Sequence, residues 1–565
     1  MDKEKIGREY DRWLKCAVED SDVAAELKAM SGAQDTIADA FYRDLEFGTG
    51  GLRGTIGAGT NRMNIHTVAK ASQGMANYVK KHAGDNECSI AVGYDSRIKS
   101  DVFANVASEV FAANGIQVYL YSELMPTPCL SFAVRSLHCA AGIMVTASHN
   151  PSKYNGYKVY GADGCQITTN AANEILGEIE STDVFDGIKR INFEEAMADG
   201  RIQYIPESVV TEFIEAVKKQ SVLSPELQID RDVAIVYSPL NGTGLKPVLR
   251  TLRESGYTNI TVVKEQEQPD GNFPTCPYPN PEIQEAMALG IEYAHRYNAD
   301  LLLATDPDCD RVGIAVKNAE GDHVLLSGNE TGMLLLDYIC SKRQANGTMP
   351  QEPVMIKTIV TIDMAERIAA DYGVKTINVL TGFKFIGEQI GMLEAAGKED
   401  SYIFGFEESY GYLSGSYVRD KDAVDGAFLI CEMFAYYKFL GIGLWDKLQE
   451  LYKKYGYCLN TLHSYSFEGA AGFEKMQKIM ENLRENLTAL GGRKVMTCLD
   501  YAKGLDGLPK SKVLKFLLEG NCSVVVRPSG TEPKMKAYIS VSAVDEKTAR
   551  TEEKRLVEKL AEFFA

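Results

Sequence analysis

The sequence lacks the features of a secreted or membrane-spanning protein. Its twelve cysteines are scattered over 565 residues and include no Cys-x-x-Cys pair, which predicts reduced, mostly buried thiols instead of a disulfide framework. The charged N-terminus is not followed by the apolar core of a signal peptide. The most apolar stretch, 427–445, contains Glu432, Lys438 and two glycines, whereas a membrane span needs about 20 nearly uncharged residues. We interpret it as a buried helix and expect a cytoplasmic protein.

Positive charge is also in short supply. The chain has 60 Lys and Arg against 78 Asp and Glu, a formal net charge of −18. Binding to nucleic acid requires a basic face that neutralises phosphates, and anionic membranes attract basic segments. We therefore expect neither partner. A small anionic substrate stays compatible with this charge, because a few local cations can dominate the potential inside a cleft.

Two nucleotide-binding motifs are missing. The loop Gly48–Gly54 resembles a dinucleotide-binding loop, but Arg53 stands at the sixth place of Gly-x-Gly-x-x-Gly. No Walker A sequence is present. If the protein handles phosphate, we expect it to do so without a nucleoside triphosphate.

The length predicts three to four domains at roughly 150 residues per domain. Residues 1–45 show helical spacing of apolar side chains, and beyond them short β-branched runs alternate with helical segments, which is typical of α/β domains. The last part differs and predicts a helix over 472–489, several strands and a final helix over 544–563. The breaks between these patterns predict domains at 1–205, 206–322, 323–455 and 456–565.

Three apolar runs each lead directly into a dense polar cluster: 140–145 into 146–151, 299–304 into 305–311, and 402–406 into 407–411. Each run predicts a short buried strand. Open α/β sheets bind their ligands at the carboxyl ends of such strands. The pattern therefore predicts three similar α/β domains that face one cleft.

The first cluster, Thr146-Ala-Ser-His-Asn-Pro151, contains a serine at the end of a strand. Backbone amides of a tight turn allow such a serine to act as a nucleophile or to carry a phosphate. The alternative is an ordinary turn, because Ser, Asn and Pro all favour turns. No Gly-x-Ser-x-Gly frame surrounds Ser148, so the nucleophile elbow of a hydrolase is not indicated.

The second cluster places Asp306, Asp308 and Asp310 at alternating positions, followed by Arg311. Three hard oxygen ligands are what Mg²⁺ or Ca²⁺ requires. A calcium EF-hand is excluded, because it would have Gly where Arg311 stands and Glu where Lys317 stands. A solvated acidic turn is the alternative, but neighbouring carboxylates repel one another unless a cation offsets them, so we favour a metal site.

Two further clusters have the chemistry of ligand contacts. Glu407-Glu408-Ser409 could orient the hydroxyls of a polyol, or could form the acidic first turn of a helix. Arg527-Pro-Ser-Gly-Thr-Glu-Pro-Lys534 combines a bidentate cation, two hydroxyls and a glycine, which favours a phosphate cradle over a plain turn. Lys384 and Lys421 are uninformative when taken singly.

These four motifs, in this order, resemble those of the α-D-phosphohexomutase superfamily, and within it the phosphoglucomutases. The likeness runs from about Phe47 to the C-terminus, and 269–282 and 381–387 also look like the family. The long N-terminal arm is similar to the longer-chain branch, which includes enzymes for hexose and pentose phosphates. The resemblance implies four domains around a central cleft: three similar α/β domains with mixed sheets and a smaller α+β C-terminal domain.

The resemblance also implies roles for individual residues. Ser148 would carry the phosphoryl group, and Mg²⁺ would bind Asp306, Asp308, Asp310 and the serine phosphate. Lys158 and Lys421 would transfer protons, with His149 as a further catalytic position. The implied substrate-binding residues are Arg53, Arg311, Lys384, Glu407, Ser409, Arg527, Ser529, Gly530 and Thr531.

The implied activity is the interconversion of α-D-glucose 1-phosphate and glucose 6-phosphate, with glucose 1,6-bisphosphate as intermediate and activator. Mannose or pentose phosphates are alternative substrates, and a metal-assisted sugar phosphatase is an alternative activity. Related enzymes for both mannose and glucose phosphates have Gly-Glu-Met-Ser-Gly-His, where this chain has Phe406, Glu408 and Gly411 in place of the first Gly, Met and His. This favours a glucose-type loop, but Phe406 leaves the sugar open.

Overall fold

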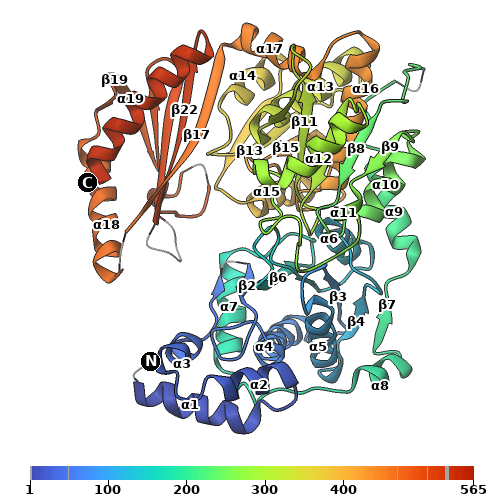
Figure 1. Cartoon of the computed structure of the whole chain (residues 1–565), viewed down its shortest axis with the longest axis vertical. Coiled ribbons are helices and arrows are strands. Elements are labelled where there is room, and N and C mark those ends of the chain that lie inside the picture. The colour runs from blue at the N-terminus through green and yellow to red at the C-terminus, as the bar shows by residue number, and fades with distance from the viewer. Residues whose placement is uncertain are drawn as a thin grey trace.

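Four β-sheets organise the described part of the chain in the computed structural model (Figure 1). The structure describes residues 3–48, 50–84, 86–224, 226–467, 469–505, 507–528 and 534–564. Mixed sheets of seven, five and four strands follow one another, and an antiparallel sheet of six strands completes the fold. The predicted fold class, three α/β domains followed by an α+β domain, is confirmed.

A helical arm precedes the first sheet, as predicted for residues 1–45. It consists of α1 (Lys3–Cys16), α2 (Ser21–Ala29) and α3 (Gln34–Phe41). Trp13 and Phe41 are fully buried, and their ring centroids lie 5.7 Å apart. Trp13 also packs edge-on against His66 and Phe185 of the first α/β domain. An aromatic cluster therefore attaches the arm to that domain.

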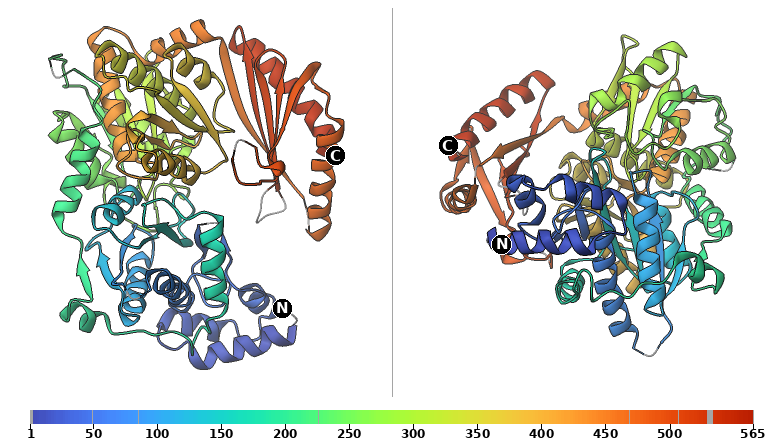
Figure 2. Two further views of the ribbon diagram at one scale, coloured as in Figure 1. Left: turned by 180° about the vertical axis from the view of Figure 1, so that it is seen from behind. Right: turned by 60° about the horizontal axis from the view of Figure 1, so that its bottom comes forward.

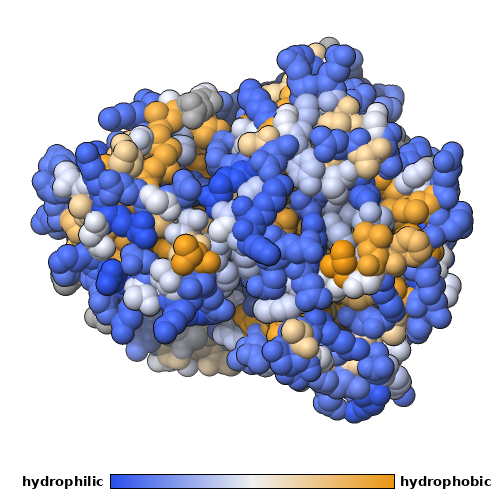
Figure 3. Space-filling view, turned by 90° about the horizontal axis from the view of Figure 1, so that it is seen from above, coloured by the Kyte–Doolittle hydropathy of each residue, from blue (hydrophilic) through white to orange (hydrophobic). Residues whose placement is uncertain are grey.

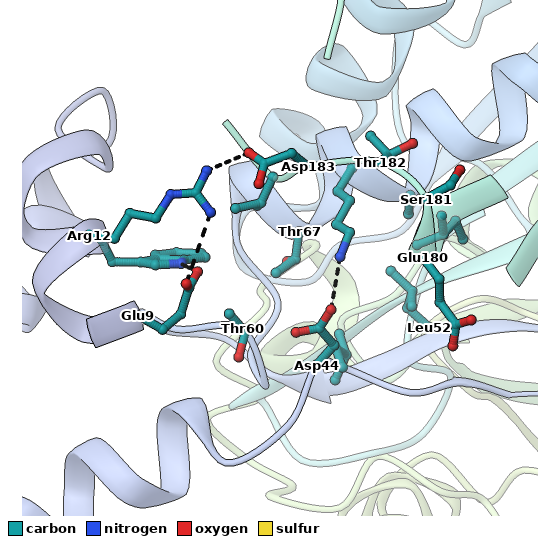
Figure 4. A pocket seen from close by; sticks show the side chains of 16 residues that line it. Glu9, Arg12, Asp44, Leu52, Thr60, Thr67, Glu180, Ser181, Thr182 and Asp183 are labelled. Atoms are coloured by element: carbon teal, nitrogen blue, oxygen red, sulfur yellow. Dashed lines mark hydrogen bonds and ion pairs between the residues drawn. The ribbon is translucent and has the colours of Figure 1, made fainter. Parts of the chain in front are cut away.

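A cavity of about 410 Å³ lies between the arm and the first α/β domain. Two ion pairs at this cavity are Arg12–Asp183 and Lys70–Asp44, with N···O distances of 2.5 and 2.8 Å. Figure 4 shows Arg12 pointing toward Asp183. Both acidic partners are largely exposed to solvent, and exposed ion pairs stabilise proteins only weakly. The aromatic cluster therefore contributes more to the attachment than these charges do.

The first sheet has the strand order β1-β2-β6-β5-β3-β4-β7. Its pairs β5–β3, β3–β4 and β4–β7 are parallel, whereas β5–β6, β6–β2 and β2–β1 are antiparallel. The strands are β1 (Phe47–Gly48), β2 (Gly51–Thr55), β3 (Ser89–Tyr94), β4 (Gln117–Leu120), β5 (Ala141–Val145), β6 (Tyr154–Gly161) and β7 (Ile202–Tyr204). The helices are α4 (Ile65–Ala83), α5 (Ser100–Ala113), α6 (Thr127–Ser136), α7 (Thr169–Glu180) and α8 (Phe193–Ala198).

The second sheet has the order β12-β11-β10-β8-β9. Its strands are β8 (Ile235–Ser238), β9 (Ile260–Val262), β10 (Leu301–Thr305), β11 (Val312–Lys317) and β12 (His323–Leu326). Its helices are α9 (Glu207–Lys218), α10 (Leu245–Glu254), α11 (Lys264–Glu267) and α12 (Gln284–Arg296). Because β12 pairs with β11, this sheet extends to Leu326, beyond the domain boundary placed at residue 322.

The third sheet has the order β14-β13-β15-β16. Its strands are β13 (Val354–Thr358), β14 (Lys375–Val379), β15 (Tyr402–Phe406) and β16 (Tyr412–Leu413). The helices of this part are α13 (Gly328–Ala345), α14 (Met364–Asp371), α15 (Phe383–Ala395), α16 (Ala423–Phe439) and α17 (Leu444–Tyr455), with a short 3₁₀ helix at Glu399–Ser401.

One topological unit recurs in these three sheets. A fully buried strand, β5, β10 or β15, pairs in parallel with a neighbour and then continues through a polar loop into an antiparallel strand, β6, β11 or β16. Burial on both faces explains why these strands are continuous apolar runs in the sequence. Each of the three polar clusters is therefore the connection of such a strand pair.

The last sheet is entirely antiparallel, with the order β17-β22-β21-β20-β19-β18, and α18 and α19 lie on its outer face (Figures 1 and 2). Its strands are β17 (Tyr457–Ser466), β18 (Ala489–Leu490), β19 (Arg493–Asp500), β20 (Leu514–Leu518), β21 (Cys522–Pro528) and β22 (Lys534–Ala543). The helices α18 (Gly469–Asn486) and α19 (Glu546–Phe564) match the helices predicted near 472–489 and 544–563. A 3₁₀ helix spans Tyr501–Lys503.

Two features attach this fourth domain to the third. It has a hydrophobic core of its own, but five of its buried residues join the larger core that the other three domains share: Cys458, Tyr501, Leu508, Val513 and Val525. Beside Val525, the Asp363 carboxylate accepts hydrogen bonds from Lys515 Nζ at 2.7 Å and Ser523 Oγ at 2.6 Å, and Lys357 Nζ lies 3.3 Å away. An ionic cluster and an apolar contact thus hold the fourth domain beside the third.

The apolar stretch 427–445 is not one helix. It is divided between α16 and α17, which meet at an angle of 87° because the chain breaks at Gly441 and Gly443. In the described part of the chain no single helix is long and apolar enough to cross a membrane, although this bent pair passes the same test when its helices are combined. Most of α16 is buried, as predicted. The face of the molecule in Figure 3 is largely hydrophilic, with scattered apolar patches.

All twelve cysteines are free thiols, and nine of them are buried. The prediction from their spacing is therefore confirmed. The exposed members are Cys16 and Cys498, and Cys88 is half-buried.

We expect Phe41→Ala to destabilise the arm by about 3–5 kcal/mol, because it removes a fully buried ring from the aromatic cluster. Trp13 and Trp445 are the only tryptophans, so a Trp445→Phe background makes fluorescence report on Trp13 alone during urea unfolding. Val18→Ala is the control, because Val18 is 67% exposed. Equal urea midpoints for the two variants would contradict the attachment by aromatic packing.

Candidate active site

Polar residues from three domains meet at one place. Ser148 Oγ, from the β5–β6 loop, lies 3.0 Å from Asp306 Oδ2 of the β10–β11 loop. Lys421, which follows β16, places its Nζ 2.8 Å from Asp310 Oδ2. The structure thus brings the expected phosphoserine, the aspartates and a lysine from three domains into direct contact. This agrees with the general position of ligand sites at the carboxyl ends of strands.

Ser148 is held in an unusual backbone conformation. Its φ is +54°, in the left-handed region that non-glycine residues seldom adopt, and the residue is buried. Its N–H donates to Thr146 Oγ1 at 2.8 Å, and its Oγ also lies 3.1 Å from His149 Nδ1. Such strain persists only where surrounding contacts impose it, and here it turns the hydroxyl toward the aspartates.

Arg97, at the end of β3, supplies those contacts. Its buried guanidinium donates to four carbonyl oxygens of the serine loop: those of Ser148, Asn150, Pro151 and Tyr154. The charge of Arg97 is balanced by Asp95, 3.4 Å away. Burial lowers the pKa of Arg97 and raises that of Asp95, and the attraction between the two charges opposes both shifts. One buried cation therefore fixes the shape of the whole loop.

Asp306, Asp308 and Asp310 are almost completely buried, and each offers a carboxylate oxygen within 4.8 Å of the others. Burial and the charges of the other two carboxylates raise the pKa of Asp306. Within the described residues, Asp308 Oδ1 and Asp310 Oδ1 are buried without a hydrogen-bond partner. Orphaned, mutually repelling oxygens are what a divalent cation would satisfy. The residues present therefore fit a divalent metal ion.

Two lysines flank the aspartates. Lys158 Nζ, on β6, lies 2.8 Å from Asp308 Oδ2 and 3.3 Å from Asp310 Oδ2, and Lys421 Nζ lies 2.8 Å from the same oxygen of Asp310. Burial alone would lower the pKa of each lysine, but the neighbouring carboxylates outweigh it and raise both values. Both side chains are thus ammonium ions in this arrangement.

Arg311 and Arg53 add positive charge to the same region. Arg311 pairs with Glu282 at 2.5 Å; burial opposes its charge, but Glu282 and Asp310 raise its pKa. Arg53, on β2, is near enough to interact electrostatically with Asp308 and Arg311. Burial and Arg311 also lower the pKa of the half-buried His149 well below its usual value, so this imidazole is neutral at physiological pH.

The third loop presents Glu407, Glu408 and Ser409. Glu407 is 5% exposed and accepts a hydrogen bond from the Gly382 N–H at 3.0 Å, while Glu408 and Ser409 are half-buried. The loop backbone packs closely on the start of α13, where a Cβ on Gly328 would lie 2.2 Å from the Glu408 carbonyl oxygen. This close packing fixes the position of the carboxylates.

Two positions that bear on sugar choice have structural roles. Phe406 is fully buried against Gly332, where a Cβ would lie 2.2 Å from the ring, so Phe406 belongs to the core and does not contact a ligand. Gly411 leaves room for the stem of Lys421, since a Cβ there would lie 2.4 Å from Lys421 Cδ. A histidine at position 411 would therefore displace this lysine.

The remaining expected residues lie around this centre or outside the described residues. Lys384 is in the first turn of α15, next to Cys165 and Glu388, and burial lowers its pKa. Arg527, on β21, is half-buried and its charge acts on Tyr538, which also senses Glu407 and Glu408. Ser523 and Val525 of β21 line the same cavity as Glu408 of the third loop. Ser529, Gly530 and Thr531 lie outside the described residues.

A small cavity of about 180 Å³ connects the third loop with the fourth domain. Glu282 and Glu408 line one side, and Ser523 and Tyr538 line the other. Carboxylate and hydroxyl groups from different domains therefore border the same space.

Reasoning from the sequence missed several residues of this site. Arg97 and Asp95 follow the apolar run 89–94 in the same way as the three recognised clusters follow theirs, and that signal could have identified them. Thr127, whose hydroxyl donates to Asp308 Oδ2 at 3.0 Å, and Tyr160 offer no such signal. Their partners are more than 150 residues away in the chain.

Three family descriptions match this chain. Residues 44–184 match "Phosphoglucomutase/phosphomannomutase, alpha/beta/alpha domain I", residues 211–321 match its domain II, and residues 327–455 match its domain III. These matches contain the serine, aspartate and glutamate loops respectively.

Curated relatives resemble the chain over nearly its full length. A phosphoglucomutase of Staphylococcus saprophyticus is 37% identical over 525 residues, which cover 90% of this chain and 93% of that protein. A phosphoglucomutase of Staphylococcus aureus strain MRSA252 is 37% identical over 519 residues, which cover 90% of this chain and 91% of that protein.

Solved structures share the fold. Parafusin (phosphoglucomutase) from Paramecium, in an open form, has a TM-score of 0.69 at 17% identity, covering 92% of this chain and 96% of that chain. A putative phosphomannomutase from Thermus thermophilus has a TM-score of 0.68 at 21% identity, covering 92% of this chain and 99% of that chain. The family matches and the curated relatives together show that this chain belongs to the phosphoglucomutase/phosphomannomutase family.

Proposed function

We propose that the protein is a phosphoglucomutase, which interconverts α-D-glucose 1-phosphate and glucose 6-phosphate through a phosphoryl group carried on Ser148. The observation that carries this proposal is the contact of Ser148 Oγ with Asp306, at the centre of a cluster of three buried carboxylates and two lysines. Curated relatives named phosphoglucomutase, 37% identical over 90% of the chain, support the same reaction.

The charges around Ser148 suit a phosphoryl group. Phosphoserine carries about −1.5 to −2 charge at neutral pH, and Lys158, Lys421 and Arg311 lie beside the aspartates that its oxygen faces. Asp306, Asp308 and Asp310 would hold a divalent cation, which we propose is Mg²⁺. When bound, this cation would neutralise charge on the phosphoryl oxygens.

The first transfer moves the phosphoryl group from Ser148 to the free hydroxyl of a sugar monophosphate. The bond between phosphorus and the serine oxygen breaks, and a bond between phosphorus and the sugar oxygen forms. The serine oxygen gains a proton and the sugar hydroxyl loses one. A lysine at the site, Lys158 or Lys421, can donate a proton to the serine oxygen and accept one from the sugar hydroxyl. It thereby returns to its ammonium form.

The product of this transfer is a sugar bisphosphate, glucose 1,6-bisphosphate in the proposed reaction. It must turn around so that its other phosphate returns to Ser148. Glu407 and Ser409 would hold the sugar hydroxyls, while Arg527 with residues 529–531 would bind the phosphate that does not react. Because the two phosphate-bearing ends of the ligand exchange places, the same cradle binds the phosphate that does not react in both transfers.

Replacing the phosphoryl carrier should abolish this reaction. We expect Ser148→Ala to lower kcat for glucose 6-phosphate formation by about 10³-fold or more, even with glucose 1,6-bisphosphate present, because the nucleophile is lost. Ser152→Ala, in the same loop, is the matched control. A Ser148→Ala variant with near-wild-type turnover would refute the phosphoserine role.

The same assay separates the alternative activities. Release of inorganic phosphate in place of glucose 6-phosphate would identify a phosphatase. Rates with mannose 1-phosphate and ribose 1-phosphate would reveal a preference for another sugar.

The metal assignment predicts the behaviour of Asp308→Asn. This variant keeps the shape of the side chain but removes a charged ligand, so Mg²⁺ affinity measured by calorimetry should fall at least about tenfold, together with Mg²⁺-dependent activity. Asp322→Asn, at an exposed position of the same domain, is the control. Unchanged Mg²⁺ binding in Asp308→Asn would exclude the aspartate cluster as the site.

Glu407 predicts a distinct pH dependence of stability. Burial raises its pKa to about 7, and Glu408 adds to this against the opposing charge of Lys421. A folded-state pKa above the unfolded value gives stability that is complete below about pH 4.5 and lost as the pH rises through 7, a change of about 3 kcal/mol. We therefore compare the free energy of unfolding of metal-free Glu407→Gln with that of metal-free wild type. The variant's value minus the wild-type value should be larger at pH 8 than at pH 5.

Urea unfolding at both pH values measures this effect, and Glu320→Gln, at an exposed position, is the control. Identical pH dependence in wild type and Glu407→Gln would show that Glu407 is not a buried carboxyl of raised pKa.

A further inference from the structure

Strand β6 presents two polar side chains on one face. Alternate residues of a strand point to the same side, and Lys158 and Tyr160 therefore share the face toward the centre of the site. Lys158 Nζ contacts Asp308, and the Tyr160 hydroxyl donates to Asp420 Oδ2 at 2.8 Å. The first domain thus reaches both the aspartate loop and the segment that carries Lys421.

Asp420 also contacts Lys421. Its second oxygen, Oδ1, accepts the Lys421 backbone N–H at 2.9 Å and lies 3.4 Å from Lys421 Nζ. Tyr160 is 0% and Asp420 4% exposed. A hydrogen bond to a buried carboxylate is among the stronger ones in proteins, because water does not compete for it.

The lysine has three close neighbours. Its stem packs on Gly411, and its Nζ lies 2.8 Å from Asp310 Oδ2 and 3.4 Å from Asp420 Oδ1. Asp310 is also one of the expected metal ligands, so its oxygens would be shared between the lysine and the metal ion. Of the two carboxylates within 4 Å of the Lys421 ammonium group among the described residues, Asp420 is the one outside the metal cluster.

We propose that the Tyr160–Asp420 pair is a positioning device that fixes the Lys421 ammonium group for phosphoryl transfer. Tyr160 orients the Asp420 carboxylate, and Asp420 holds Lys421 independently of Asp310. The pair makes no contact with the reacting atoms and acts through Lys421. This inference rests on the proposed mutase reaction, in which Lys421 serves at the site of transfer.

The same strand offers a matched control. Tyr157 is as deeply buried as Tyr160, but it points to the opposite face, into the core of the first domain, where its hydroxyl lies 3.0 Å from Ser72 Oγ. Tyr160→Phe and Tyr157→Phe each remove one buried hydroxyl from β6. A purely structural effect would be similar in the two variants.

We expect Tyr160→Phe to lower kcat about tenfold or more, with KM for glucose 1-phosphate and the Mg²⁺ activation constant within about twofold of wild type. Tyr157→Phe should retain wild-type kcat. Because Tyr160 acts through Asp420, the double variant Tyr160→Phe/Asp420→Asn should be no slower than Asp420→Asn alone. Equal kcat for the two Tyr→Phe variants, or additive losses in the double variant, would overturn the proposal.

A crystal structure of Tyr160→Phe provides a readout that does not depend on activity. We expect the Asp420 carboxylate to rotate and Lys421 Nζ to move by about 1 Å or more, a displacement large enough to slow a reaction. An unmoved Lys421 would refute positioning by this pair even if wild type proved inactive on glucose 1-phosphate. A wild-type protein without mutase activity would instead refute the proposed function, so the two failures are distinguishable.

Discussion

The repulsion among three buried carboxylates is the constraint on which the site depends. Asp306, Asp308 and Asp310 each place a carboxylate oxygen within 4.8 Å of the others. Ionised groups cannot be buried so closely without compensating positive charge. Lys158 from the first domain and Lys421 from the third supply part of it. The acidic loop of the second domain is thus stable in this form because its neighbours deliver cations, which ties the arrangement of the domains to the electrostatics of one cluster.

The recurring strand pairs explain how these charges converge. In each of three sheets the polar loop follows a strand buried on both faces, so its residues stand at the end of a rigid, fully packed element. Arg97 then fixes the serine loop by donating hydrogen bonds to the carbonyl oxygens of that loop. Gly328 and Gly411 permit close packing around the glutamate loop. Rigid strands set the coarse position of each loop, and these buried contacts set the final orientation of its side chains.

The sequence was sufficient for the features that are local. Apolar runs ending in polar residues predicted the three central strands and their loops, and the helical arm and the last two helices were also predicted. It was insufficient wherever distant segments decide the outcome. The bond between Tyr160 and Asp420 joins residues 260 apart, and no periodicity reveals it. The sequence motif predicts that Phe406 bears on sugar choice, but its ring fills a space that Gly332 on α13 leaves open.

A net charge of −18 is compatible with the proposed phosphosugar substrate, because Lys158, Lys421 and Arg311 gather at one site. The same uneven placement extends to the fourth domain. Ser523, which donates a hydrogen bond to Asp363 of the third domain, and Arg527 lie on the same strand, β21. At about 3.3 Å per residue they are roughly 13 Å apart. The strand that packs beside the third domain at Ser523 and Val525 therefore carries, at its far end, the cation that we propose for the phosphate that does not react.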